Sequence, residues 1–215
     1  MTLTELQKIV SKGEGLFTEF KHKINFPDKI AREVVAFANT AGGNLFIGVD
    51  DNKTIFGLKN VDEEVFAFEQ LIKNYIKFPV NYSLEKIKVH PKKDVLAVKI
   101  QESTQKPVFA LEDPKHRFGT AYVRVKDKSV KASNEMLKIL KLQAAGIQTG
   151  ITFGEQEKKV LKLIEKDGFV TLKKLQDEAL VSTNTASDLL VNMTLAGVLS
   201  IEAEEEKEDR FFLRE

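Results

Sequence analysis

The sequence predicts an α/β domain followed by a small winged-helix domain. A helix with one apolar stripe ends at a double glycine and passes directly into an apolar strand, which is typical of an α/β unit. A β-rich segment follows, and the C-terminal part has the order helix, strand, helix, helix and hairpin, which is the winged-helix order. We place the domains at residues 1–146 and 151–215, on either side of a short linker. A chain of 215 residues can form one domain of about 150 residues and a smaller second one.

The helices of the first domain are predicted from apolar spacing and from residues that begin or end helices. Thr2 and Glu5 have the spacing of a capping box before the first helix. Pro27 suits the first turn of the second helix, and the glycines at 42–43 can take the positive φ that ends it. We expect the helices at 3–12, from Pro27 to the double glycine, at about 62–77 and at about 134–145.

The strands of the first domain are predicted from apolar alternation between turn residues. The turn at 91–94 joins two strands into a hairpin, and a loop centred on 113–116 separates the last two. A further short strand ends at Gly57. We expect the other strands at 16–23, 44–50, 82–89, 95–101, 107–112 and 120–126.

The second domain is predicted in the same way. Gly168 ends its first helix, and Gly197 ends its third, just before an apolar strand. We expect helices at 155–166, 172–179 and 183–196, a short strand at 169–171, and a hairpin of strands 198–202 and 210–214.

Composition limits the class of protein. The chain has no cysteine, so it has no disulfide framework and no thiolate metal site, which fits a reducing compartment. No apolar run reaches the roughly 20 residues that span a bilayer, and no signal peptide is visible, so we expect a soluble, cytoplasmic protein without a membrane partner. The net charge of +1 divides into +6 for residues 1–150 and −5 for residues 151–215. A polyanion should therefore prefer the N-terminal part.

Acidic side chains occur where two predicted strands begin and end. Glu19 and Lys21 share one strand face, Glu14 precedes them, and Asp50 and Asp51 follow the strand after the double glycine. If the two strands are neighbours, these carboxylates offer the hard oxygen ligands that Mg²⁺ or Mn²⁺ requires. Such a metal could polarise a phosphoryl oxygen, with Lys21 stabilising the developing charge. The alternative is a surface Glu19–Lys21 pair and an ordinary acidic turn. The three histidines have no metal-ligand spacing.

A basic stripe is predicted on the last strand of the first domain. Alternation places one aromatic and several basic side chains on the strand face opposite its valines, and a further lysine extends the stripe. Basic groups beside an aromatic ring can contact phosphates while the ring stacks on a base. The alternative is an ordinary solvated strand face. The candidate nucleic-acid-binding residues are Tyr122, Arg124, Lys126, Lys128 and Lys131.

The predicted winged helix lacks the usual features of a DNA reader. Its third helix has no lysine or arginine to reach base edges, and the wing at 202–209 is strongly acidic. Polar residues at 182–185 could still make neutral contacts. We expect this domain to bind a protein partner or a second copy of the chain rather than to read DNA directly.

Several segments together resemble one known family. They are Glu19-Phe-Lys21, Ala36-Phe-Ala-Asn-Thr-Ala-Gly-Gly43, Ile47-Gly-Val-Asp-Asp51, Lys106-Pro-Val108 and Tyr122-Val-Arg-Val125. This combination resembles the Schlafen AlbA_2 domain family over roughly two-thirds of the chain. The family pattern often has Arg-x-Gly after the last of these strands, where this chain has Arg124-Val-Lys126. Some relatives are labelled ATP-binding, but this chain has no Gly-x-x-x-x-Gly-Lys-Ser/Thr loop, so that property is not carried over to it.

The resemblance implies a mixed-sheet α/β (α+β) domain that binds nucleic acid. Prokaryotic members are often joined to a helix-turn-helix and described as transcriptional regulators. Eukaryotic relatives use two glutamates and an aspartate to cut RNA, and the matching positions here are Glu14, Glu19 and Asp50 or Asp51. We expect a DNA-binding regulator without a cofactor. The alternative is an endoribonuclease that acts on structured RNA with Mg²⁺ or Mn²⁺, and a third possibility is a protein-interaction scaffold.

Overall fold

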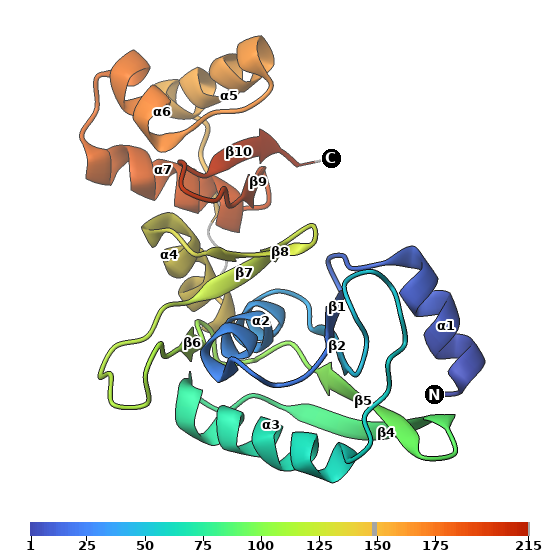
Figure 1. Cartoon of the computed structure of the whole chain (residues 1–215). Coiled ribbons are helices and arrows are strands. Elements are labelled where there is room, and N and C mark those ends of the chain that lie inside the picture. The colour runs from blue at the N-terminus through green and yellow to red at the C-terminus, as the bar shows by residue number, and fades with distance from the viewer. Residues whose placement is uncertain (148–149, 215) are drawn as a thin grey trace. The chain divides into compact units, whose positions relative to one another are not determined.

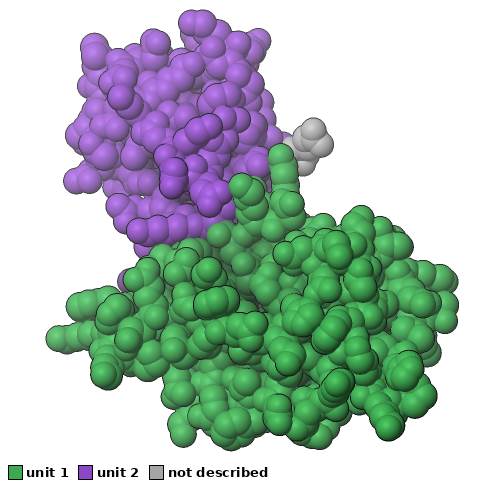
Figure 2. All heavy atoms as spheres, viewed as in Figure 1, with its two compact units in different colours: residues 1–129 green, residues 130–215 purple. Residues whose placement is uncertain are grey.

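The chain forms two compact units in a computed structural model that describes residues 1–147 and 150–214. Unit 1 is Met1–Ser129 and unit 2 is Val130–Glu215, coloured separately in Figure 2. The boundary precedes α4 (Asn134–Ala144), which was expected to close the first domain. The predicted division at 146–151 stays a prediction, because compactness does not show which segment folds or functions alone. Part of the predicted linker lies outside the described residues.

Unit 1 is built on a four-stranded mixed sheet with the order β1-β2-β5-β4. β1 (Thr18–Lys21) runs parallel to β2 (Gly43–Ile47), and α2 (Pro27–Asn39) connects them. β5 (Lys93–Ile100) is antiparallel to β2 and also to β4 (Tyr82–His90), its hairpin partner. The predicted mixed α/β sheet and the hairpin around 91–94 are therefore confirmed (Figure 1).

Both faces of this sheet are buried, which explains why β2 and β5 are nearly continuous apolar runs. Leu45 and Ile47 point into a cluster with α2 and α3 (Val61–Tyr75). Phe46, between them, points into a second cluster with α1 (Leu3–Lys12). The capping box predicted for α1 is present, since Thr2 Oγ1 accepts a hydrogen bond from the backbone of Glu5, and the Glu5 carboxylate accepts one from Thr2 N–H.

The double glycine is required where α2 passes into β2. Gly42 has φ +73°, a conformation that side chains disfavour. A Cβ on Gly43 would lie 2.2 Å from the Phe37 ring, so α2 can turn tightly onto the strand only with glycine there. The predicted helix end is confirmed, and this turn sets the position of the loop that follows β2.

Two short strand pairs follow the sheet, and the last of their strands crosses the boundary between the units at 129–130. β3 (Ile76–Lys77) pairs with β6 (Phe109–Ala110), and β7 (Tyr122–Val125) pairs with β8 (Lys128–Lys131). The strands expected at 107–112 and 120–126 are thus shorter than predicted, and β8 was not expected. β7 packs against α2, so the chain that follows the sheet returns to cover that helix.

Unit 2 contains α4, α5 (Glu155–Asp167), α6 (Leu172–Ala179), α7 (Thr183–Leu195) and a hairpin of β9 (Leu199–Glu202) and β10 (Arg210–Leu213). Val170 makes a β-bridge with Phe211. The predicted order of elements after residue 154 is confirmed, and the apolar cores of the three helices and the hairpin merge into one cluster. α7 also packs against α4. Within the described residues, none of the helices is long and apolar enough to cross a membrane.

Candidate functional site

Arg124 in β7 is the centre of a buried polar network. Its guanidinium side chain is fully buried and donates hydrogen bonds to four groups from different segments. Nη1 lies 2.6 Å from Glu33 Oε2 in α2, 3.1 Å from Glu19 Oε2 in β1 and 3.1 Å from Ser129 Oγ in β8. Nη2 lies 2.8 Å from the carbonyl oxygen of Gly15. One side chain thus connects the loop before the sheet, the edge strand, the crossover helix and the β7–β8 hairpin.

The face of β7 that carries Arg124 packs on α2. The guanidinium carbon is 4.7 Å from the centroid of the Phe37 ring, and the Arg124 backbone N–H donates to Thr40 Oγ1 at 2.9 Å. On the same face, the guanidinium carbon of Arg32 lies 5.8 Å from the Tyr122 ring centroid. This face of the strand is therefore occupied by the helix.

Two carboxylates and two cations face one another in the network. Glu19 is 5% exposed and accepts hydrogen bonds from both Arg124 and Lys21. Burial raises the pKa of Glu33, and the charge of Glu19 raises it further, while the hydrogen bond from Ser129 opposes the shift. Burial alone would lower the pKa of Lys21, but the hydrogen bond to Glu19 and its charge outweigh burial and raise it. The network holds its charges in place and leaves little of Glu19 for solvent.

Glu14 lies beside this network without joining the arginine. Its Oε1 accepts a hydrogen bond from the backbone N–H of Phe20 at 2.8 Å. Burial raises the pKa of Glu14, and the charges of Glu19 and Asp51 add to the shift, against the hydrogen bond from Phe20. The structure therefore brings Glu14, Glu19 and Lys21 close enough to interact.

Asp50 makes a different pairing. Its Oδ1 lies 2.5 Å from Nδ1 of His22, whose ring centroid is 4.3 Å from that of Phe56. The parallel register explains the separation from Glu19: Lys21 pairs with Ile47, so Asp50 lies beyond the carboxyl end of both strands. Across residues 1–147 and 150–214, no three acidic or histidine side chains are placed so that they could hold a metal ion. The expected convergence of Glu14, Glu19, Asp50 and Asp51 on one metal is not formed in this arrangement.

The predicted basic stripe needs a correction. Arg124 was expected on an exposed face, but its side chain is fully buried because α2 covers that face. Tyr122 is partly exposed, whereas Lys126, Lys128 and Lys131 are exposed. The surface available to a polyanion is therefore the β7–β8 hairpin. Arg124 does not belong to that surface but connects the hairpin to α2 through Glu33.

The Asn-Thr pair at the end of α2 has a structural role that the sequence did not indicate. Asn39 is 1% exposed, and its Nδ2 donates to the carbonyl oxygens of Val108 at 2.9 Å and Tyr122 at 3.0 Å. Its Oδ1 accepts from Val108 N–H at 2.8 Å. Together with Thr40, which accepts from the Arg124 backbone, it connects α2 to two segments about 70 to 85 residues later in the chain.

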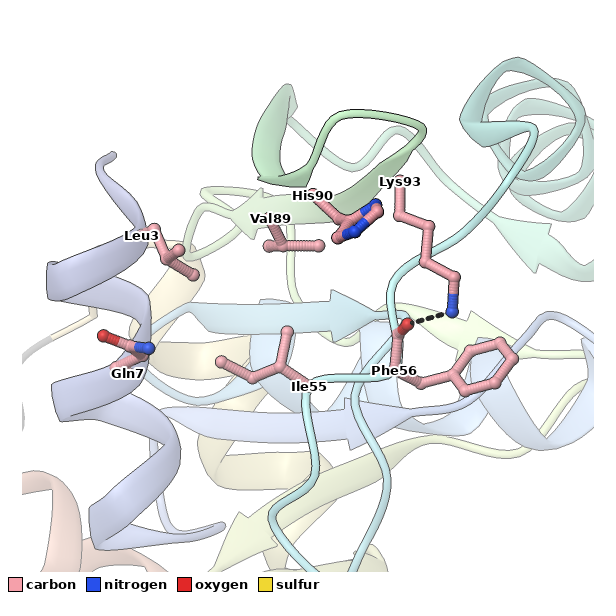
Figure 3. A pocket seen from close by; sticks show the side chains of 7 residues that line it. All are labelled: Leu3, Gln7, Ile55, Phe56, Val89, His90 and Lys93. Atoms are coloured by element: carbon pink, nitrogen blue, oxygen red, sulfur yellow. Dashed lines mark hydrogen bonds between the residues drawn. The ribbon is translucent and has the colours of Figure 1, made fainter.

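The hollows on unit 1 include two of several hundred cubic ångströms. The first, of about 520 Å³, is at the carboxyl ends of β1 and β2, and its lining includes Lys21, His22, Asp50 and Asp51. The second, of about 410 Å³, is shown in Figure 3 and is lined by Leu3, Gln7, Ile55, Phe56, Val89, His90 and Lys93. In that hollow the Lys93 ammonium already donates to the Phe56 carbonyl oxygen at 2.9 Å and lies 4.2 Å from the ring centroid.

Comparison with known proteins assigns the fold of this site to a family. A sequence profile described as Schlafen, AlbA_2 matches residues 14–133, which is more than half of the chain and includes all of the network. The chain belongs to the Schlafen AlbA_2 family. The Glu14–Glu19 segment, the Asn39–Thr40 pair and Arg124 are therefore elements of a Schlafen AlbA_2 domain in this chain. A search of the curated proteins finds no match to this chain.

Two solved structures are similar to this AlbA_2 chain at low identity. The DIP2311 protein from Corynebacterium diphtheriae is 16% identical, with a TM-score of 0.46 over 93% of this chain and 34% of that one. The N-terminal domain of an ATP-dependent DNA helicase RecG-related protein from Nitrosomonas europaea is 23% identical, with a TM-score of 0.45 over 58% of this chain and 89% of that one. The chain thus spans about a third of the length of the Corynebacterium protein.

Proposed function

We propose that this chain is a nucleic-acid-binding protein, that its Schlafen AlbA_2 domain makes the contact, and that it acts as a DNA-binding transcriptional regulator. Family membership over residues 14–133 is the observation that carries the proposal. The distribution of charge supports it. Residues 1–129 carry a net charge of +4, and residues 130–215 carry −3. A polyanion would be attracted to the first unit.

The β7–β8 hairpin is the part of the domain that best fits a phosphate backbone. Lys126, Lys128 and Lys131 extend from it with exposed side chains. Lys126 lies in the turn with φ +56°. Arg124 and Ser129 attach the two strands to Glu33 of α2, so the lysines are presented on an anchored support. Anchoring lowers the conformational entropy that is lost when a surface binds its ligand.

We propose that the second unit is a winged helix used for protein contact rather than for reading bases. The order of its elements and its single core support the winged helix. In a winged helix of this element order α7 would be the recognition helix, yet Ser187 on α7 is 3% exposed and bonds to Glu135 and Lys138 of α4. One side of α7 packs against α4 and another lies in the apolar core. Little of the helix surface therefore remains to enter a DNA groove. A second copy of the chain or another protein is the expected partner.

The hairpin can be tested by removing charge while keeping a polar side chain. Lys126→Gln/Lys131→Gln should weaken binding of the whole chain to labelled DNA and make log Kd less dependent on log salt, by about 0.9 for each phosphate that is no longer neutralised. Lys59→Gln/Lys92→Gln removes two exposed lysines outside the hairpin and is the matched control. If both pairs weaken binding equally, general charge and not the hairpin makes the contact.

The proximity of two acids favours a second candidate, a metal-dependent endoribonuclease. Glu14 and Glu19 repel each other in a partly buried place, which a divalent cation would relieve. Catalysis would also require Asp50 or Asp51 to move toward them. Incubation with a structured RNA, with and without Mn²⁺, separates the candidates. Cleavage that Glu19→Gln abolishes would establish the enzyme, and metal-independent binding without cleavage would establish the binder.

A further inference from the structure

The loop between β6 and β7 combines exposed cations with an exposed aromatic ring. Phe118 is 82% exposed, and the three residues before it are Lys115, His116 and Arg117, all exposed. The guanidinium carbon of Arg117 lies 5.5 Å from the centroid of the Phe118 ring. The ring therefore offers an open face beside positive charge, which is the combination that a nucleic-acid base and its phosphates can use.

The base of this loop is firmly held. Ala110 and Thr120 exchange two backbone hydrogen bonds, at 2.9 and 2.8 Å, and Leu111 N–H donates to the carbonyl oxygen of Tyr75 at the end of α3. Gly119 packs so closely on β6 that a Cβ there would lie 2.7 Å from the Ala110 carbonyl oxygen. These bonds fix the base of the loop, and the ribbon in Figure 1 shows the loop extending between β6 and β7.

The loop is internally ordered as well. The Asp113 side chain accepts a hydrogen bond from Lys115 N–H at 2.8 Å, and its carbonyl oxygen accepts one from His116 N–H at 2.9 Å. This turn places the acids Glu112 and Asp113 at the start of the loop and the cations beside the ring at its end. Attraction for an anion is thus concentrated around Phe118.

An aromatic pair lies at the base of the loop. Phe78, at the end of β3, is 57% exposed, and its ring centroid is 6.2 Å from that of Phe109 in β6. Gly119 lies against Phe109, since a Cβ on it would be 2.9 Å from the Phe109 Cβ. The chain therefore enters the loop from one aromatic pair and leaves it directly after a third, isolated ring.

We propose that this loop, residues 112–119, is a stacking site for unpaired bases of a single-stranded nucleic acid. Every base has a π-face that can stack on a phenylalanine ring, and the adjacent Lys115 and Arg117 supply positive charge for the flanking phosphates. A duplex would not fit the ring, because its bases are already stacked. The inference rests on the proposed nucleic-acid-binding function, and it adds a specific class of ligand and a second contact surface besides the β7–β8 hairpin.

The test uses the whole chain and two fluorescein-labelled probes, a 12-nucleotide oligothymidylate and a duplex DNA of the same length. Phe118→Ala should weaken binding of the single strand about 5-fold to 150-fold, which corresponds to the loss of one stacked base. Phe118→Tyr keeps the ring and should bind within about twofold of the parent protein. Duplex affinity should be unchanged in both variants. Because Phe118 is almost fully exposed, neither substitution should alter folding.

The matched control is Phe66→Ala on α3, where an exposed phenylalanine of 63% exposure has acidic neighbours at 62–64. It should leave single-strand binding unchanged. Two outcomes would overturn the inference. If the parent protein binds duplex but Phe118→Ala has no effect on the single strand, the loop is not a stacking site and the proposed function survives. If the parent protein binds neither probe, the stacking site and the proposed function both fail.

Discussion

Replacing Arg124 should destabilise unit 1 more than any exposed substitution. Arg124→Leu removes the fully buried cation that Glu19 and Glu33 face, and leaves two carboxylates with Lys21 as the remaining neighbouring cation of the network. Breaking a buried ion pair by removing one partner costs about 3–5 kcal/mol, because the other charge stays buried. The free energy of unfolding should therefore fall by about 3–5 kcal/mol at pH 7, measured by urea titration followed by circular dichroism.

The loss should depend on pH in a defined direction. Burial raises the pKa of Glu33, so at lower pH this carboxylate becomes protonated and no longer buries a charge, and the difference from the parent protein should shrink as pH falls from 7 toward 4.5. Arg32→Leu is the control, since the contacts of Arg32 with Asp28 and with the Tyr122 ring are partly exposed and its replacement should cost about 0–1 kcal/mol. A loss below about 1 kcal/mol for Arg124→Leu, or one that is constant with pH, would refute the buried network as a source of stability.

Three further results are expected. Burial holds the folded-state pKa of Glu33 above its ordinary 4.5, so the free energy of unfolding should fall as pH rises above 4.5 and Glu33 loses its proton. Glu33→Gln should flatten this fall in urea titrations between pH 4 and 8. Asn39→Ala should lower the free energy of unfolding by about 1–3 kcal/mol for each buried backbone group left unpaired, whereas Asn52→Ala, in an exposed turn, should change it by about 0.5 kcal/mol or less. Asn184→Ala, at the exposed start of α7, should leave DNA affinity within about twofold, and a tenfold loss would mean that unit 2 reads DNA.

The elements were predictable because their signals are local. Apolar spacing, the capping box at Thr2, and the glycines that end α2, α5 and α7 each act within a few residues of the element they define. The pairing of Glu19 with Lys21 was predictable for the same reason, since period-two geometry alone places the two side chains on one face.

The network around Arg124 was not predictable, because its partners come from long range. Alternation correctly placed Tyr122 and Arg124 on one face of a strand, but no local pattern states that α2 covers that face. Glu33 and Ser129 carry no motif of their own, and they reach Arg124 only because β7 returns to α2. An arginine on a strand with an apolar opposite face can point into solvent or pair with a buried partner. Only the tertiary fold determines which of the two occurs.

The central claim is that the AlbA_2 domain binds nucleic acid through phosphate contacts. The most direct measurement is the affinity of the whole chain for fluorescein-labelled duplex DNA by anisotropy, at salt concentrations between 50 and 200 mM. If the three exposed lysines of the β7–β8 hairpin each neutralise one phosphate, log Kd should rise with log salt at a slope of about 2.7. Absence of binding at 50 mM salt, or an affinity that does not change with salt, would contradict the claim.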